Sequence, residues 1–174
     1  MRRATRLSKQ AILFTHQERF KDAKKLLKEA DGLFAKLHSV AKTYPDMFYS
    51  GLVDAAFQEY AEAQTLLSLV EKNRFLSPEE INVNSVAFVL GIADVIGELR
   101  RRALDSLRKE EVKTAEACLH LMEEIYVELM SMDEAYMLGS IERLLTSGFC
   151  SEARLRQALA DSVDLNDKDA FTYC

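Results

Sequence analysis

The chain has 174 residues, of which 48% are apolar and 29% are charged, and its net charge at pH 7 is −5. That length suits one ordinary domain with a substantial core. No run of about 18 uninterrupted apolar residues occurs, and Met1 leads into charged residues rather than an apolar signal segment, so we expect a soluble, cytoplasmic protein without a membrane segment.

Long periodic apolar segments, with only six Gly and two Pro, predict an all-α protein. We expect the first helix to cover residues 3–42, because its apolar residues recur at steps of three and four. Pro45 then ends the helical pattern. A second helix is expected over residues 46–73. The segment 77–80, Ser-Pro-Glu-Glu, matches a capping box that opens a short helical turn.

Later helices are expected over residues 85–108, 113–130 and 133–146, with a short one over 151–159. The polar end, residues 161–174, is expected to be loose. Helices of this length joined by short connections predict an antiparallel bundle of about six to seven helices in a single domain.

The positive charge is concentrated at the start of the chain. Residues 1–28 hold nine Lys and Arg against two acids, a net charge of +7, which leaves −12 for the remainder. A basic helix can form a phosphate-binding surface on an acidic protein. The alternative is a solvated helix face. The candidates for nucleic-acid contact are Arg2, Arg3, Arg6 and Lys9.

Two acids, Asp94 and Glu98, interrupt the most apolar stretch of the chain, residues 86–99, which contains no Lys or Arg. A buried carboxylate is costly unless it is paired, binds a metal or shifts its pKa. Two more acids, Glu59 and Glu62, are spaced three apart on the preceding helix, so each pair projects from one helix face. If the two helices pack side by side, four carboxylates converge.

Such an oxygen-only ligand set suits Mg²⁺ or Mn²⁺. A ferritin-like di-iron site would need a Glu-x-x-His pair on each of two helices, and neither pair of acids supplies a His. The alternatives are that Glu59 and Glu62 are solvated surface charges and that Asp94 is a structural acid that caps a helix or bonds a tyrosine. Gly91 and Gly97 suggest close helix approach or access to the site, which packing alone also explains.

Three segments resemble the translin family, and within it the catalytic branch, translin-associated factor X. They are Arg6 to Lys9 (RLSK), Gln58 to Ala63 (QEYAEA) and Val89 to Leu99 (VLGIADVIGEL), and they recur in the family's order. The third segment, with its acids in place, is the specific one. The helical pattern of the family extends over most of the chain.

This resemblance implies a helical subunit of a hollow octamer that encloses nucleic acid. It also implies that the protein is a metal-dependent endoribonuclease acting on single-stranded RNA. It also implies that Glu59, Glu62 and Asp94 serve in catalysis and that Glu98 joins them in binding metal. The chain lacks the N-terminal extension and the insertion of the eukaryotic catalytic subunit, so the resemblance fits compact archaeal-type members that form homo-oligomers better. A translin-like partner chain is a further expectation.

We therefore predict a Mg²⁺-dependent (or Mn²⁺-dependent) endoribonuclease that works as a homo-octamer. Within Arg100–Arg102, Arg101 is the candidate for phosphate contact, with solvation as the alternative. Two other hypotheses stay open, a non-catalytic module that binds single-stranded RNA or DNA and a helical scaffold for protein partners. The expectation of an oligomer also depends on large apolar residues beyond the needs of one core, namely Phe34, Phe48, Tyr126 and Phe149.

Overall fold

The computed structural model describes residues 1–44 and 51–132, and this part of the chain contains five helices and no strand. The all-α fold class is therefore confirmed. The chain divides into two compact units, Met1–Val95 and Ile96–Cys174, with the boundary inside the fourth helix. The helices are α1 (Arg2–His16), α2 (Phe20–Ala41), α3 (Gly51–Lys72), α4 (Ser85–Leu107) and α5 (Val112–Ser131).

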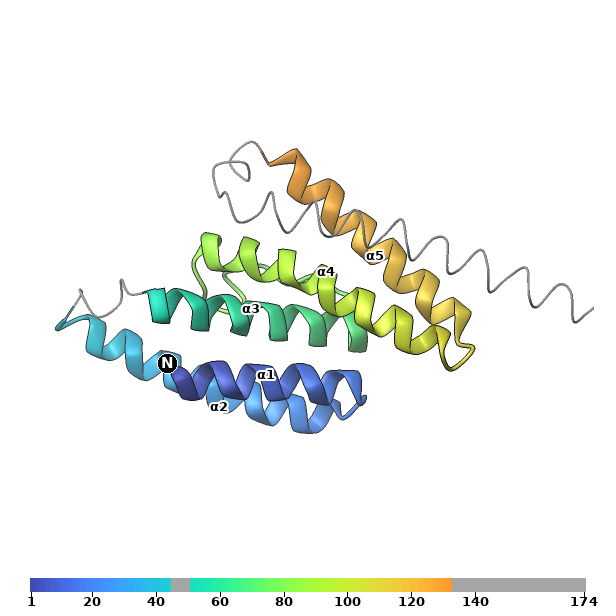
Figure 1. Ribbon diagram of the computed structural model, residues 1–174. Coiled ribbons are helices and arrows are strands. Elements are labelled where there is room, and N and C mark those ends of the chain that lie inside the picture. The colour runs from blue at the N-terminus through green and yellow to red at the C-terminus, as the bar shows by residue number, and fades with distance from the viewer. Residues whose placement is uncertain (45–50, 133–174) are drawn as a thin grey trace, which may run out of the picture. The chain divides into compact units, whose positions relative to one another are not determined.

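In the first unit α3 is the central helix. It contacts both helices of the α1–α2 hairpin on one side and the first part of α4 on the other (Figure 1). An aromatic cluster joins α2 to α3, because the ring of Phe34 stacks on Phe57 at 4.5 Å and lies 5.0 Å from Tyr60. Phe34 is a core residue with 3% of its surface exposed. The prediction that it exceeds the needs of one core, and so supports an oligomer, was wrong.

The long first helix expected over residues 3–42 is instead two helices, α1 and α2. Glu18 adopts a left-handed conformation (φ 57°), the Arg19 amide donates to Phe14 O at 2.9 Å, and the Glu18 amide donates to Thr15 O at 3.0 Å. This pattern is a Schellman turn, which normally places Gly at the left-handed position. No Gly or Pro marks the turn, and the available signal was a run of four polar residues from His16 to Arg19.

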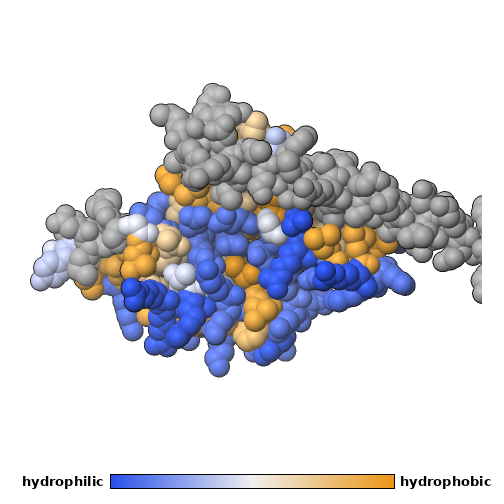
Figure 2. Space-filling view, in the orientation of Figure 1, coloured by the Kyte–Doolittle hydropathy of each residue, from blue (hydrophilic) through white to orange (hydrophobic). Residues whose placement is uncertain are grey.

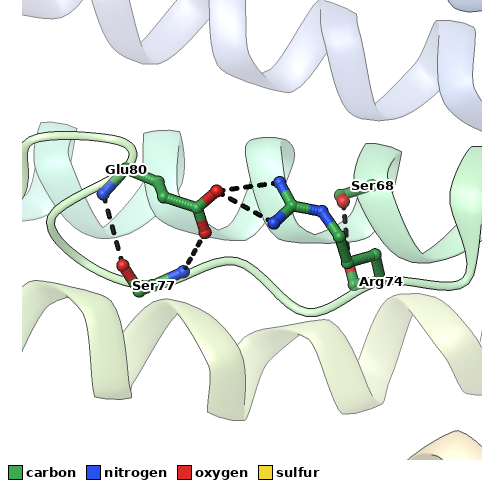
Figure 3. A network of polar contacts seen from close by, with 4 residues as sticks. All are labelled: Ser68, Arg74, Ser77 and Glu80. Carbon is green, nitrogen blue, oxygen red and sulfur yellow. Dashed lines mark hydrogen bonds and ion pairs between the residues drawn. The ribbon is translucent and has the colours of Figure 1, made fainter.

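The connection between α3 and α4 is held by the predicted capping box (Figure 3). Glu80 accepts from the Ser77 amide at 2.9 Å, and the Glu80 amide donates to Ser77 Oγ at 3.4 Å. Both terminal nitrogens of Arg74 donate to Glu80 at 2.9 Å, and Ser68 Oγ donates to Arg74 O at 2.7 Å. The same carboxylate therefore closes the turn and ties it, through Arg74, to the end of α3.

Asn84 directly precedes helix α4, and its side-chain oxygen accepts from the Ala87 amide at 2.8 Å and so caps the helix. The helix is buried along one face rather than all round, since Ala87 and Val95 are buried while Val86 is 50% exposed. At Gly91 the backbone of α4 touches the backbone of α3. A Cβ added there would lie 2.7 Å from Gln58 O and 2.9 Å from Glu62 N, so only Gly permits this approach.

For Gly97, close helix approach and access to the site were both expectations, and the structure tests the first of them. A Cβ at Gly97 meets no atom of the described residues within 4 Å, so this glycine does not serve close packing there.

The α4–α5 turn, in the second unit, repeats the Schellman pattern with Glu110 at φ 63° and the Glu111 amide donating to Ser106 O at 2.9 Å. The helices expected over 133–146 and 151–159, the tail, Phe48 and Phe149 lie outside the described residues.

The outer face of the α1–α2 hairpin seen in Figure 2 is mainly hydrophilic, with smaller hydrophobic areas between the polar ones. This surface fits an amphipathic pair whose buried residues, among them Leu7, Ala11 and Leu27, face the core. Within residues 1–44 and 51–132, no helix combines the length and apolar character needed to span a lipid bilayer.

Candidate metal and nucleic-acid site

Asp94 lies where α4 meets α3, and its side chain is half-buried. Its Oδ2 accepts a hydrogen bond from Gln58 Nε2 at 2.7 Å. The partner is thus a side-chain amide rather than the helix end or the tyrosine that a purely structural acid was expected to have. The Gln58–Asp94 contact joins the two sequence segments that carry the predicted acids.

Burial is the main influence on the protonation of Asp94. It raises the pKa of this carboxyl above the ordinary value, and the hydrogen bond from Gln58 opposes the rise with a smaller effect. Desolvation disfavours the charged form of a carboxyl group, whereas a donor that bonds the ionised form favours it. A carboxyl group with this perturbation is a candidate functional group.

The two acids of α3 differ in exposure. Glu62 is buried, with 8% of its surface exposed, so the solvated alternative was wrong for it. The side chain of Glu59 is 19% exposed and lies 3.5 Å from Lys9 Nζ of α1. Gln58 and Glu62 are one helical turn apart on α3. The backbone of α4 at Gly91 contacts this turn between Glu62 and Gln58, whose side chain bonds Asp94.

In the second unit Glu98 and Arg101 are neighbours on one helix face. Their closest atoms, Glu98 Oε2 and Arg101 Nη1, are 3.6 Å apart, and the arginine side chain is 53% exposed. Arg101 therefore has a carboxylate partner one turn away. Its expected contact with phosphate, and the expected metal role of Glu98, stay predictions.

The candidate metal ligands of the first unit, Glu59, Glu62 and Asp94, are all carboxylates. Across the described ranges 1–44 and 51–132, no three His, Cys, Asp or Glu side chains form a group arranged to hold a metal ion. The expected convergence of four carboxylates is therefore not seen among the described residues. Mg²⁺ is commonly held by one or two carboxylates together with waters and substrate phosphates, so the donor chemistry fits an open site.

The basic residues of α1 divide into two groups. Arg2, Arg6 and Lys9 are exposed and follow one another at steps of four and three, so they share one helix face. Arg3 forms an ion pair with Glu29 of α2. Lys9 is the link between this basic face and the acids, because it pairs with Glu59.

Sequence reasoning missed Gln58 as part of this site. Its signal was present, since it directly precedes Glu59 and stands four residues before Glu62, on the same helix face. An amide has no distinctive chemistry by itself, and only its contact with Asp94 shows its place.

The family is decided by a match along most of the chain. Residues 1–143 match the model of the translin family. The chain belongs to the translin family. An uncharacterized protein of Methanocaldococcus jannaschii is 31% identical over 128 residues, which are 73% of this chain and 55% of that protein. The chain thus spans about half the length of this curated relative.

Solved structures of similar fold agree with this assignment. The crystal structure of AfC3PO has a TM-score of 0.82 at 26% identity, covering 94% of this chain and 86% of that one. The crystal structure of apo-NeC3PO has a TM-score of 0.81 at 28% identity, covering 92% and 84%. AfC3PO is also known in complex with duplex RNA, and that structure matches with a TM-score of 0.81 at 26% identity, covering 94% and 85%.

Proposed function

We propose that this translin-family protein is a Mg²⁺-dependent endoribonuclease of the translin-associated factor X type that works as a closed homo-oligomer. The observation that carries the proposal is a pair of side-chain contacts made by two adjacent residues of α3, Gln58 and Glu59. Gln58 bonds Asp94 on one side, and the adjacent Glu59 pairs with Lys9 of the basic α1 face. Acidic and basic features that lie far apart in the sequence therefore meet in one unit.

In this proposal the candidate ligands are Glu59, Glu62 and Asp94, of which one or two would hold the cation together with water and substrate phosphate. When bound, Mg²⁺ would polarise the scissile phosphate and lower the pKa of an attacking water. Lys9, which pairs with Glu59, would contact a phosphate of the substrate, and the exposed Arg2 and Arg6 would extend the positive face along α1. A half-buried carboxyl such as Asp94 works in a lower dielectric than bulk water, which strengthens its attraction for a cation.

RNA as the ligand is supported by the relative AfC3PO, which has been captured with duplex RNA. Single-stranded RNA is the substrate we propose, and the duplex enters the test as a second labelled RNA for comparison. A translin-like partner chain would be needed only if the homo-oligomer proved inactive alone.

The test is incubation of end-labelled single-stranded and duplex RNA with the purified protein, in Mg²⁺ or in EDTA. Internal cleavage is expected with Mg²⁺ and none with EDTA, and Glu62→Gln should lower the rate by about 100-fold or more. Asp54→Asn is the matched control, because Asp54 is an exposed acid of the same helix. Binding without metal-dependent cleavage would assign the protein to the non-catalytic alternative.

Salt dependence tests the basic face separately. Each phosphate contact to single-stranded nucleic acid contributes about 0.7 to the slope of log affinity against log salt. Replacing Arg2 and Arg6 together by Gln should reduce the slope by about 1.4. An unchanged slope would show that Arg2 and Arg6 belong to a solvated helix face and do not contact phosphates.

A further inference from the structure

Gln58 bonds Asp94, one of the proposed ligands, but the proposed function gives the glutamine no role of its own. We propose that Gln58 is a positioning residue of the cation site, which holds the Asp94 carboxylate in one orientation through its 2.7 Å hydrogen bond. This inference rests on the proposed function, because it concerns how one of the proposed ligands is oriented.

The chemistry of the two groups fixes the direction of the bond. An ionised carboxylate only accepts hydrogen bonds, so the amide must present its NH₂ to Asp94. A carboxylate offers about four lone-pair sites on two oxygens, so one bond from Gln58 leaves capacity to bind a cation. A hydrogen bond to a charged acceptor is roughly twice as strong as a neutral one, which makes it an effective restraint on the side chain.

The backbone that carries Gln58 is itself restrained. Helix α4 touches α3 at Gly91, where an added Cβ would lie 2.7 Å from the carbonyl oxygen of Gln58. Gly91 and Asp94 are one turn apart on α4, so the backbone contact and the side-chain bond hold the two helices at neighbouring points. A donor on a fixed backbone can orient a ligand, whereas a donor on a mobile loop could not.

Residues that hold metal ligands in place typically matter for affinity. Changing such a partner usually lowers metal affinity or activity about 10-fold to 100-fold, although the partner never touches the metal. We expect an effect in this range from loss of the Gln58 amide.

The same helix supplies a matched control. Gln64 Nε2 donates to Tyr60 Oη at 2.6 Å, so it also makes one side-chain hydrogen bond in a part-buried setting. Six residues beyond Gln58 it points about 120° away around α3, toward α2 rather than α4. Removing either amide costs one hydrogen bond of similar length, but only Gln58 contacts a proposed ligand.

The experiment titrates the full chain with Mn²⁺, with free Mn²⁺ measured by electron paramagnetic resonance in the absence of RNA. Gln58→Met keeps the length of the side chain and removes the donor, so Mn²⁺ affinity should fall about 10-fold to 100-fold. Gln64→Met should stay within about threefold of the original protein, since it loses a bond outside the site. If Gln58→Met fails to fold, Gln58→Ala replaces it, because Ala is the best helix former.

Cleavage gives a second readout. For the Gln58 variant, the Mg²⁺ concentration at half-maximal rate should rise, and saturating Mg²⁺ should recover most of the maximal rate. Equal Mn²⁺ affinity in the Gln58 variant and the original protein would overturn the inference while leaving the nuclease proposal intact. If the original protein binds no Mn²⁺, or Asp94→Asn binds it equally well, the proposed function fails and the inference fails with it.

Discussion

The two faces of α3 each bury a polar group that a glutamine bonds, yet the groups differ in chemistry. Toward α2, Gln64 bonds the phenol of Tyr60 inside an aromatic cluster. Toward α4, Gln58 bonds the carboxyl of Asp94. Burial raises the pKa of both groups, but only the carboxyl is charged at neutral pH in its ordinary state.

This difference separates a structural role from a functional one. A neutral phenol in a core needs one partner and then contributes to stability. A carboxylate in a similar position costs stability unless something compensates it, and such costs gather at functional sites. The bond between Gln64 and Tyr60 should therefore affect stability without affecting cleavage, whereas the Asp94 carboxyl should affect cleavage.

The largest expected effect is on cleavage by Asp94→Asn. Removing the charge of a proposed ligand should lower the rate about 100-fold or more, while RNA affinity changes little. The Asn carbonyl can still accept from Gln58, so the melting temperature in EDTA should not fall. A melting temperature several degrees lower, with cleavage retained, would make Asp94 a structural acid and abolish the distinction between the two faces.

The next effect is on stability at the contact between α3 and α4. Gly91→Ala should destabilise the protein by about 1–3 kcal/mol, since its Cβ would be forced against the α3 backbone. Gly32→Ala is the matched control on α2, because a Cβ at this exposed position meets none of the described atoms within 4 Å. That change should stabilise the protein by about 0.5–1 kcal/mol. Urea unfolding of both variants measures the opposite signs.

A smaller effect is expected on the other face of α3. Tyr60→Phe removes the acceptor of Gln64 and keeps the aromatic packing, so stability should fall by about 1 kcal/mol. Cleavage should stay within about twofold of the original rate, as the phenol bonds Gln64 and its ring lies against Phe34 of α2. A large loss of cleavage in a stable Tyr60→Phe protein would show that both faces serve the reaction.

The smallest effect is a pH dependence of stability. Because the folded state raises the pKa of Asp94, its contribution to stability is greatest below about pH 3.9, the ordinary Asp value, and is lost as pH rises through the folded pKa. Asp94→Asn does not titrate. Any melting-temperature advantage of this variant in EDTA should reach a few degrees at most near pH 7 and vanish in acid. Scanning calorimetry from pH 3 to pH 8 would reveal a constant difference if burial of the charge were irrelevant.

Local sequence signals located α4 and α5 to within one residue at each end. The expectation of 85–108 became α4 at 85–107, and 113–130 became α5 at 112–131. The capping box at Ser77 and Glu80 formed as expected because its two bonds connect residues only three apart. The break between α1 and α2 was not predicted from the sequence, because Glu18 occupies a left-handed position where Gly is normally found.

The sequence by itself determined the helical class, the translin resemblance and the identity of the acids, since these depend on residue type and on spacing along the chain. Only the tertiary structure decided that Gln58 bonds Asp94, that Lys9 pairs with Glu59 and that Gly91, not Gly97, is where two backbones touch. Periodicity shows which face of a helix is apolar. It cannot show which residue of the opposite helix stands against each position, because that register is set by packing between segments far apart in the chain.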